Sequence, residues 1–215
     1  MQTISLERSV AMIPNGSSLM VGGFMAVGTP ERIVDEIVRQ KKRDLIVIAN
    51  DTAMPGKGIG KLVEAKLLRK AIVSHIGLNP ETQRQMLAGD LEVELVPQGT
   101  LIERIRAGGY GLGGILTQTG LGTSVENGKT TVEVDGRSYL VEPALRADFA
   151  LVQAFLADYL GNLSYALTAR NFNPLIAMAG RTVIVSADNI VPIGVMSPDH
   201  VVTPAPLVDF LVANM

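Results

Sequence analysis

The sequence predicts an α/β fold in which helices flank a largely parallel central sheet. Through the first two-thirds of the chain, short apolar runs rich in β-branched residues alternate with amphipathic stretches, as strands and their covering helices do. The chain of 215 residues is 47% hydrophobic and 19% charged, so it can bury a large core without disulfides or a structural metal. Its 22 glycines and 11 prolines are typical of many tight turns between strands and helices. We therefore expect a single domain over residues 1–215.

Strands and a first helix are expected to alternate near the N-terminus. Apolar runs suited to strands buried on both faces lie at residues 18–21, 45–49, 71–74 and 93–96. Between the first two runs, the segment 30–40 predicts a helix because its apolar residues recur with the helical period. Thr29 is the expected N-cap and Pro30 the expected first residue of this helix.

Two more helices are expected before residue 108. The segment 80–88 follows Asn79 as N-cap, begins with Pro80 and is closed by Gly89, which predicts a well-bounded helix. The segment 100–107 is a shorter candidate. Both are expected to cover the sheet.

The remaining chain predicts a loop, a hairpin and the last strands. Seven glycines fall between residues 108 and 122, a density that predicts a loop rather than a helix or strand. Asp135-Gly136 is a two-residue signature of a type I′ turn, so a small β-hairpin is expected around it. Its strands would be residues 130–134 and 137–141, followed by strands at 149–153, 182–185 and 201–203 and a helix at 174–179.

Charge and composition exclude several classes of function. The formal net charge is −2 and no basic tract is present, so a nucleic-acid partner is not expected. The chain has no cysteine, which excludes thiol nucleophiles and thiolate metal sites and favours a reducing compartment such as the cytoplasm. No apolar run approaches the roughly 20 residues of a membrane helix, and residues 1–12 lack the pattern of a secretory signal. We expect no membrane association.

A glycine-rich turn between a predicted strand and a predicted helix is the strongest local signal. Such a turn lets backbone N–H groups approach a ligand, and a helix N-terminus favours a phosphate or carboxylate. The turn at residues 22–30 contains neither GxGxxG nor a P-loop. A tight turn whose glycines serve geometry alone is the alternative.

Several segments resemble family I CoA-transferases, the 3-oxoacid type. Residues 15–30 are similar to the first signature of that family, and the resemblance extends to the C-terminus. Its other segments are Ile48 to Thr52, Ser74 to Gly77, Val96 to Gly109 and Ser164 to Asn173. Within the family, the chain is most similar to the α subunits that act on acetate and acetoacetate in short-chain fatty acid metabolism.

The resemblance implies a CoA-transferase α/β sandwich and a ping-pong reaction. CoA would move between acetyl-, acetoacetyl- or butyryl-CoA and a free carboxylic acid, so CoA is a substrate and no cofactor is expected. A glutamate of a partner β subunit would attack the thioester and carry the CoA as an enzyme thioester. The expected assembly is α2β2.

The resemblance also assigns roles to residues of this chain. Gln98 would face the thioester carbonyl and stabilise the oxyanion through its amide N–H. Asn50 and Asp51 follow another predicted strand and would shape the substrate pocket, with solvated loop residues as the alternative. Gly108 and Gly109 would line the same cleft as Gln98. The CoA site would include Gly22, Gly23, Phe24, Met25, Ala26, Val27 and Gly28.

Other readings of the sequence stay open. Glu126-Asn127-Gly128 imitates the sequence around the family's nucleophile, but Asn-Gly is first a turn dipeptide, so a self-sufficient enzyme is the weaker reading. His75 and His200 lack neighbours at metal-ligand spacing, and we expect structural roles and no metal. A non-catalytic module of similar fold that binds a sugar phosphate or another small anion is the alternative function.

Overall fold

The central feature of the fold is a nine-stranded, mostly parallel sheet. The computed structural model describes residues 1–213. Over this range the strands follow the order β1-β12-β11-β9-β2-β3-β4-β5, and a short strand, β10, pairs antiparallel with β9. The strands are β1 Gln2–Ile4, β2 Ser18–Val21, β3 Leu45–Ile48, β4 Leu68–Val73, β5 Glu92–Leu95, β9 Ala147–Asp158, β10 Leu163–Ser164, β11 Gly180–Val191 and β12 Phe210–Val212. The fold class predicted from the sequence is confirmed.

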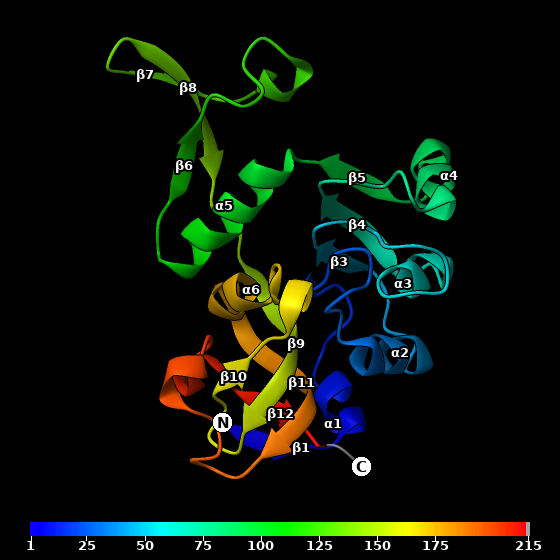
Figure 1. Ribbon diagram of the computed structural model, residues 1–215. Helices are drawn as coiled ribbons and strands as arrows, with labels where there is room; N and C mark the ends of the chain where they lie inside the picture. Colours follow the sequence, from blue (N-terminus) through cyan, green and yellow to red (C-terminus); the bar gives the residue numbers. More distant parts are fainter. Residues whose placement is uncertain (214–215) are drawn as a thin grey trace.

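Helices cover both faces of this sheet and bury two separate cores (Figure 1). One core joins helices α1 to α3 to side chains such as Leu19 and Val21 of β2. The other joins α5 and α6 to the intervening Met20, because successive side chains of a strand point to opposite faces. The helices are α1 Leu6–Ala11, α2 Glu31–Arg39, α3 Gly60–Glu64, α4 Pro80–Ala88, α5 Gln98–Gly109 and α6 Asn173–Ala179. None of them is long and apolar enough to cross a membrane.

A three-stranded antiparallel sheet projects from the main body (Figure 1). Its strands, in the order β6-β8-β7, are β6 Gly114–Thr117, β8 Arg137–Pro143 and β7 Thr131–Val134. The hairpin of β7 and β8 turns at Asp135 and Gly136, both at positive φ, as the sequence predicted. We call residues 114–143 the arm. Four 3₁₀ turns complete the described chain: Ser124–Glu126, Leu167–Arg170, Pro198–His200 and Ala205–Leu207.

The helix caps agree with the sequence at α4 but differ at α2. Asn79 Oδ1 accepts the backbone N–H groups of Glu81 and Thr82, and Gly89 ends α4 in the left-handed conformation. At α2 the N-cap is Pro30, not Thr29. The Thr29 hydroxyl instead donates to the carbonyl of Gly22 at 3.0 Å, so this side chain holds the preceding turn and the predicted cap was wrong.

The glycine-rich stretch is less loop-like than its composition predicted. Helix α5 continues through Gly108 and Gly109, and Gly114 begins β6. Close packing explains the glycine at position 108, because a Cβ there would lie 1.9 Å from the Leu145 carbonyl oxygen. The strand predicted at 201–203 is also wrong, since Thr203 forms only an isolated bridge with Leu163.

A buried carboxylate, Asp158, closes the turn between β9 and β10. It accepts the backbone N–H groups of Leu160, Gly161 and Asn162 at 2.9–3.0 Å and the Asn162 side-chain amide at 2.8 Å. Burial alone would raise the pKa of Asp158, but these hydrogen bonds outweigh it and hold the pKa below its usual value. The ionised carboxylate therefore stabilises the fold above the unfolded pKa of about 3.9, and this contribution is lost as the pH falls through the folded pKa.

Asp158→Asn should make the protein less stable at neutral pH and less sensitive to acid. The expected loss in the free energy of unfolding is about 1–3 kcal/mol, because backbone donors lose a charged acceptor. The difference between the variant and the parent should begin to shrink near pH 4 and should disappear as the pH falls through the lowered pKa of folded Asp158. Urea unfolding at a series of pH values measures both effects, with the exposed Asp90→Asn as the control. Parallel pH profiles for parent and variant would contradict the assignment.

Candidate active site

The carboxyl ends of neighbouring parallel strands meet at one edge of the main sheet, where α/β proteins place their ligands. Strand β2 leads into the turn 22–28, β3 into Asn50 and Asp51, and β4 into Ser74 and His75. Two cavities open at this edge, of about 360 and 400 Å³, and both are lined by Phe24, Asn50 and Gln98. These strand ends form the candidate active site.

Gln98 presents its side-chain amide at this edge. It is the first residue of α5 and is exposed to solvent. Its Nε2 donates to Oδ1 of Asn50 at 2.8 Å, and Asn50 is 1% exposed. Within residues 1–213 the second hydrogen of this nitrogen has no protein partner, so it is available to a ligand. The structure therefore brings the side chains of Gln98 and Asn50 into direct contact.

The glycine-rich turn forms one wall of the site. Phe24 and Val27 exchange two backbone hydrogen bonds of 2.9–3.0 Å around Met25 and Ala26. Both central residues have positive φ, 50° and 72°, as a type I′ turn requires but as non-glycine residues rarely adopt. Such backbone strain persists only where the surroundings hold it.

Contacts from two sides hold this turn. Asp51 Oδ2 accepts the backbone N–H of Met25 at 2.9 Å. On the other side, the Asn171 side chain accepts from Gly23 N at 3.1 Å and donates to the Val27 carbonyl at 2.9 Å. No role for Asn171 was predicted from the sequence, although its segment resembles the family.

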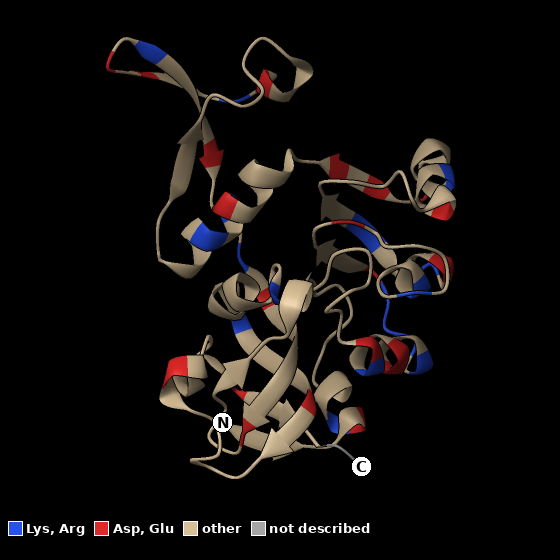
Figure 2. Cartoon of the chain, in the orientation of Figure 1, with Lys and Arg blue, Asp and Glu red and all other residues tan. Residues whose placement is uncertain are grey.

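The helix after the turn is not arranged to hold a phosphate. Glu31 lies in the first turn of α2, and its carboxylate pairs with Lys61 at 2.6 Å and accepts the Gly58 N–H at 2.8 Å. A negative charge thus already occupies the helix N-terminus. Among residues 1–213, no Lys or Arg lines either cavity at Gln98. In Figure 2 charged residues lie on helices α2–α5 and on β4 and β5, and others lie on the arm.

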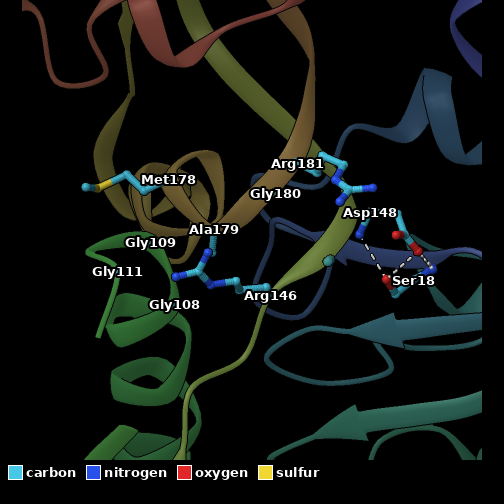
Figure 3. A pocket seen from close by; sticks show the side chains of 11 residues that line it. Ser18, Gly108, Gly109, Gly111, Arg146, Asp148, Met178, Ala179, Gly180 and Arg181 are labelled. Atoms are coloured by element: carbon cyan, nitrogen blue, oxygen red, sulfur yellow. Dashed lines mark hydrogen bonds between the residues drawn. The ribbon is translucent and has the colours of Figure 1, made fainter. Parts of the chain in front are cut away.

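Gly108 and Gly109 lie elsewhere, which corrects the expectation that they shape the pocket at Gln98. They end the helix that Gln98 begins, roughly 15 Å away at 1.5 Å per residue. There they line a different cavity of about 490 Å³, at the amino ends of β2, β9 and β11, with Arg146 and Arg181 (Figure 3). The error arose because the glycines were taken for a mobile loop rather than for close helix packing.

This second cavity has a carboxylate that is already engaged. The backbone N–H and the hydroxyl of Ser18 donate to Asp148 Oδ2 at 2.9 and 2.7 Å (Figure 3). These bonds hold the pKa of Asp148 below its usual value. The contacts join the starts of β2 and β9 and are structural.

The family profile described as Coenzyme A transferase matches residues 3–214. This chain belongs to the coenzyme A transferase family. It is 51% identical over 211 residues to the acetate CoA-transferase subunit alpha of Escherichia coli, covering 98% of this chain and 96% of the relative. It is 45% identical over 209 residues to the acetoacetyl-CoA:acetate/butyrate CoA transferase alpha subunit of Clostridium acetobutylicum, covering 97% and 96%.

A solved CoA-transferase structure shares the fold. The acyl-CoA transferase of Escherichia coli, in a thioester complex with CoA, has a TM-score of 0.88 and 23% sequence identity. The match covers 99% of this chain and 47% of that one. At this identity the likeness supports the CoA-transferase architecture.

In this CoA-transferase chain, the carboxylates near the site are not free nucleophiles. Asp51 is the one carboxylate among the described residues that line the two cavities, and it is 6% exposed with both oxygens hydrogen-bonded. Glu126 lies in the arm, where its Oε2 accepts the Gly122 N–H at 2.6 Å. That contact is the turn-stabilising role expected of the Glu126 segment.

The two histidines of this CoA-transferase chain differ in position. His75 lines the same cavity as Gln98, next to Leu78, whereas His200 is an exposed residue of a 3₁₀ turn. Proximity of His75 to the site was missed because nothing in its spacing marks a ligand. Among residues 1–213, no group of three or more His, Cys, Asp or Glu side chains could hold a metal.

Proposed function

We propose that this chain is the α-type subunit of a two-chain CoA-transferase for short-chain acids. It would move CoA between acetyl-, acetoacetyl- or butyryl-CoA and a free carboxylic acid, as the names of its relatives indicate for those proteins. The observation that carries the proposal is a cleft that offers a free amide donor at Gln98 and no free carboxylate among its described lining residues. A β subunit supplies the nucleophilic glutamate.

In the proposed reaction, Gln98 stabilises the negatively charged tetrahedral intermediate. The partner's glutamate carboxylate attacks the thioester carbonyl, and the carbonyl oxygen becomes an oxyanion that accepts the free N–H of Gln98. Collapse expels the CoA thiolate and leaves an acyl-glutamyl anhydride. The thiolate then attacks the glutamyl carbonyl, which releases the first acid and forms the enzyme-CoA thioester. The second acid reverses these steps.

The surface around the cleft supports a partner that covers it. Phe24, Val27 and Leu167 are apolar side chains with exposed fractions of 45%, 50% and 94%. The first two belong to the glycine-rich turn, and Leu167 precedes Thr168, which lines a cavity with Gln98. A β subunit that buries these side chains would bring its glutamate to the cleft. An α2β2 assembly, one domain over residues 1–215 and a cytoplasmic location belong to the same proposal.

The composition of the cleft supports binding of the acyl end of CoA rather than its phosphates. No Lys or Arg is among the described residues that line the cavities at Gln98, and Met25 and Leu78 supply apolar surface for a short alkyl chain. We therefore assign residues 22–28 to the pantetheine and acyl part, and the nucleotide to another surface of the assembly. The absence of Lys and Arg from these described lining residues argues against a sugar-phosphate binding module.

A reconstitution assay tests this function. The purified chain, a candidate β subunit and their mixture are each assayed for transfer of CoA from acetoacetyl-CoA to acetate. We expect activity only in the mixture, and Glu126→Gln should leave that activity unchanged because Glu126 serves a turn in the arm. Activity of the isolated chain that is lost in Glu126→Gln would overturn the shared site.

A further inference from the structure

A chain of hydrogen bonds runs from a buried carboxylate to the catalytic amide. Asp51 Oδ2 accepts from Asn50 Nδ2 at 2.7 Å, and Asn50 Oδ1 accepts from Gln98 Nε2 at 2.8 Å. Asp51 and Asn50 are 6% and 1% exposed, whereas Gln98 is exposed. The chain therefore begins in the protein interior and ends in the cleft.

The chemistry of the three side chains allows only one donor-to-acceptor direction along this series of hydrogen bonds. An ionised carboxylate can only accept hydrogen bonds, so Asn50 must turn its NH₂ group toward Asp51. The side-chain oxygen of Asn50 then faces Gln98. Because this oxygen only accepts hydrogen bonds, Gln98 must donate to it from its own NH₂ group. With the amide of Asn50 reversed, Gln98 would have to present its carbonyl oxygen, and its N–H groups would swing away from this position.

The backbone of Asn50 cannot absorb a change at Asp51. The carbonyl of Asn50 accepts the Ser74 N–H at 2.9 Å and the Ser74 hydroxyl at 2.7 Å, which join β3 to β4. When Asp51 changes, the side-chain amide of Asn50 can therefore rotate, but the backbone of Asn50 stays in place.

The same carboxylate also holds the strained turn. Met25 N donates to Asp51 Oδ2 at 2.9 Å, and Ala53 N donates to Oδ1 at 2.6 Å. Met25 has a φ of 50°, so this bond offsets backbone strain in the wall of the cleft. Asp51 Oδ2 thus accepts hydrogen bonds from both Met25 N and Asn50 Nδ2, and it links the turn to Gln98 through them.

We propose that Asp51 is a positioning residue for CoA transfer, which sets the orientation of the Gln98 amide through Asn50 so that an N–H faces the developing oxyanion. This role rests on the proposed function of Gln98. Asp51 does not react with substrate; it determines which end of the Gln98 amide is held at Asn50.

The test compares Asp51→Asn with Gln98→Ala and with the double variant in the reconstituted two-subunit enzyme. An asparagine at position 51 can donate as well as accept, so the direction of the chain is lost. We expect kcat to fall by about 10–100-fold, less than or equal to the loss of one oxyanion donor, with KM for acetoacetyl-CoA changed less than about threefold. The double variant should be no more than about threefold slower than Gln98→Ala.

Two further variants separate positioning from folding. Asp158→Asn makes the same substitution at a buried, loop-closing carboxylate remote from the cleft and should leave kcat unchanged. Met25→Gly removes the backbone strain at φ 50°, so adding it to Asp51→Asn restores the turn without restoring the direction of the chain. The kcat of this combination should stay as low as that of Asp51→Asn, relative to Met25→Gly alone.

The outcomes distinguish the proposal from the function on which it rests. Additive effects of Asp51→Asn and Gln98→Ala, an effect on KM alone, or recovery of kcat with Met25→Gly would each overturn the positioning role while the transferase function stands. An unchanged kcat in Gln98→Ala would instead remove the proposed role of Gln98 itself.

Discussion

Gln98→Ala should lower kcat of the reconstituted enzyme by about 10²–10³-fold, the usual effect of removing one oxyanion donor. The side chain is exposed and makes one protein hydrogen bond, to Asn50, so its removal should not disturb folding. Its free N–H gains a strong acceptor only when the thioester carbonyl becomes an oxyanion. The loss should therefore appear in kcat and in kcat/KM by similar factors. Initial rates of acetoacetyl-CoA consumption with saturating acetate measure this.

A matched glutamine controls for the loss of a side-chain amide. Gln40 is the C-cap of α2 and lines neither cavity at Gln98. Its Nε2 donates to the Glu7 carbonyl at 2.9 Å and to Glu36 Oε1 at 2.5 Å. Gln40→Ala should keep full activity. Gln98→Glu, which keeps the shape but replaces the donor with a negative charge, should be at least as slow as Gln98→Ala. Activity within about threefold of the parent in Gln98→Glu would be incompatible with oxyanion stabilisation.

Local signals in the sequence predict most of the fold around the site. Strands buried on both faces, such as Leu45–Ile48, appear as uninterrupted apolar runs because neither face meets water. Asn79 and Gly89 bound α4 because their side chain and backbone satisfy the helix ends locally. Such features depend on a few neighbouring residues and can be read without the tertiary structure.

Features that depend on distant partners were not predictable. Strand β1 pairs with β12 from the opposite end of the chain, and the sequence of neither short strand indicates its partner. Gly108 suggests a loop by composition, yet it lies in α5, where the carbonyl of the distant Leu145 leaves no room for a side chain. The position of Thr29 suggests an N-cap, but its hydroxyl donates to the Gly22 carbonyl instead.

The same distinction holds for the site. Family resemblance led to Gln98 and to the turn at residues 22–28, and parallel strand order explains why Asn50 lies beside them. The direction of hydrogen bonding from Asp51 through Asn50 could not be read from the sequence, because it depends on which atoms face each other across β3 and α5. Figure 1 shows β3 and β4 side by side, to the right of α5.

Gly22→Ala should destabilise the protein and disrupt the wall of the active site at the same time. A Cβ on Gly22 would lie 1.9 Å from Oδ1 of Asn173, which is fully buried. Asn173 cannot turn away without loss, because its Oδ1 accepts Gln153 N at 3.0 Å and its Nδ2 donates to the carbonyls of Gly28 and Ala169, both at 2.9 Å. The added methyl group therefore either strains the chain or breaks buried hydrogen bonds.

The expected loss in the free energy of unfolding is about 2–4 kcal/mol, from overpacking together with at least one buried polar group left unpaired. Urea unfolding measures it, and Gly113→Ala is the control because a Cβ there would meet no atom within 4 Å. Gly113→Ala should change stability by less than about 0.5 kcal/mol. Asn173→Ala in the Gly22→Ala background removes the clash, so the double variant should lose less than the sum of the two single variants. Strictly additive losses would mean that Asn173 does not require glycine at position 22, and the turn would then owe its shape to Asp51 and Asn171 alone.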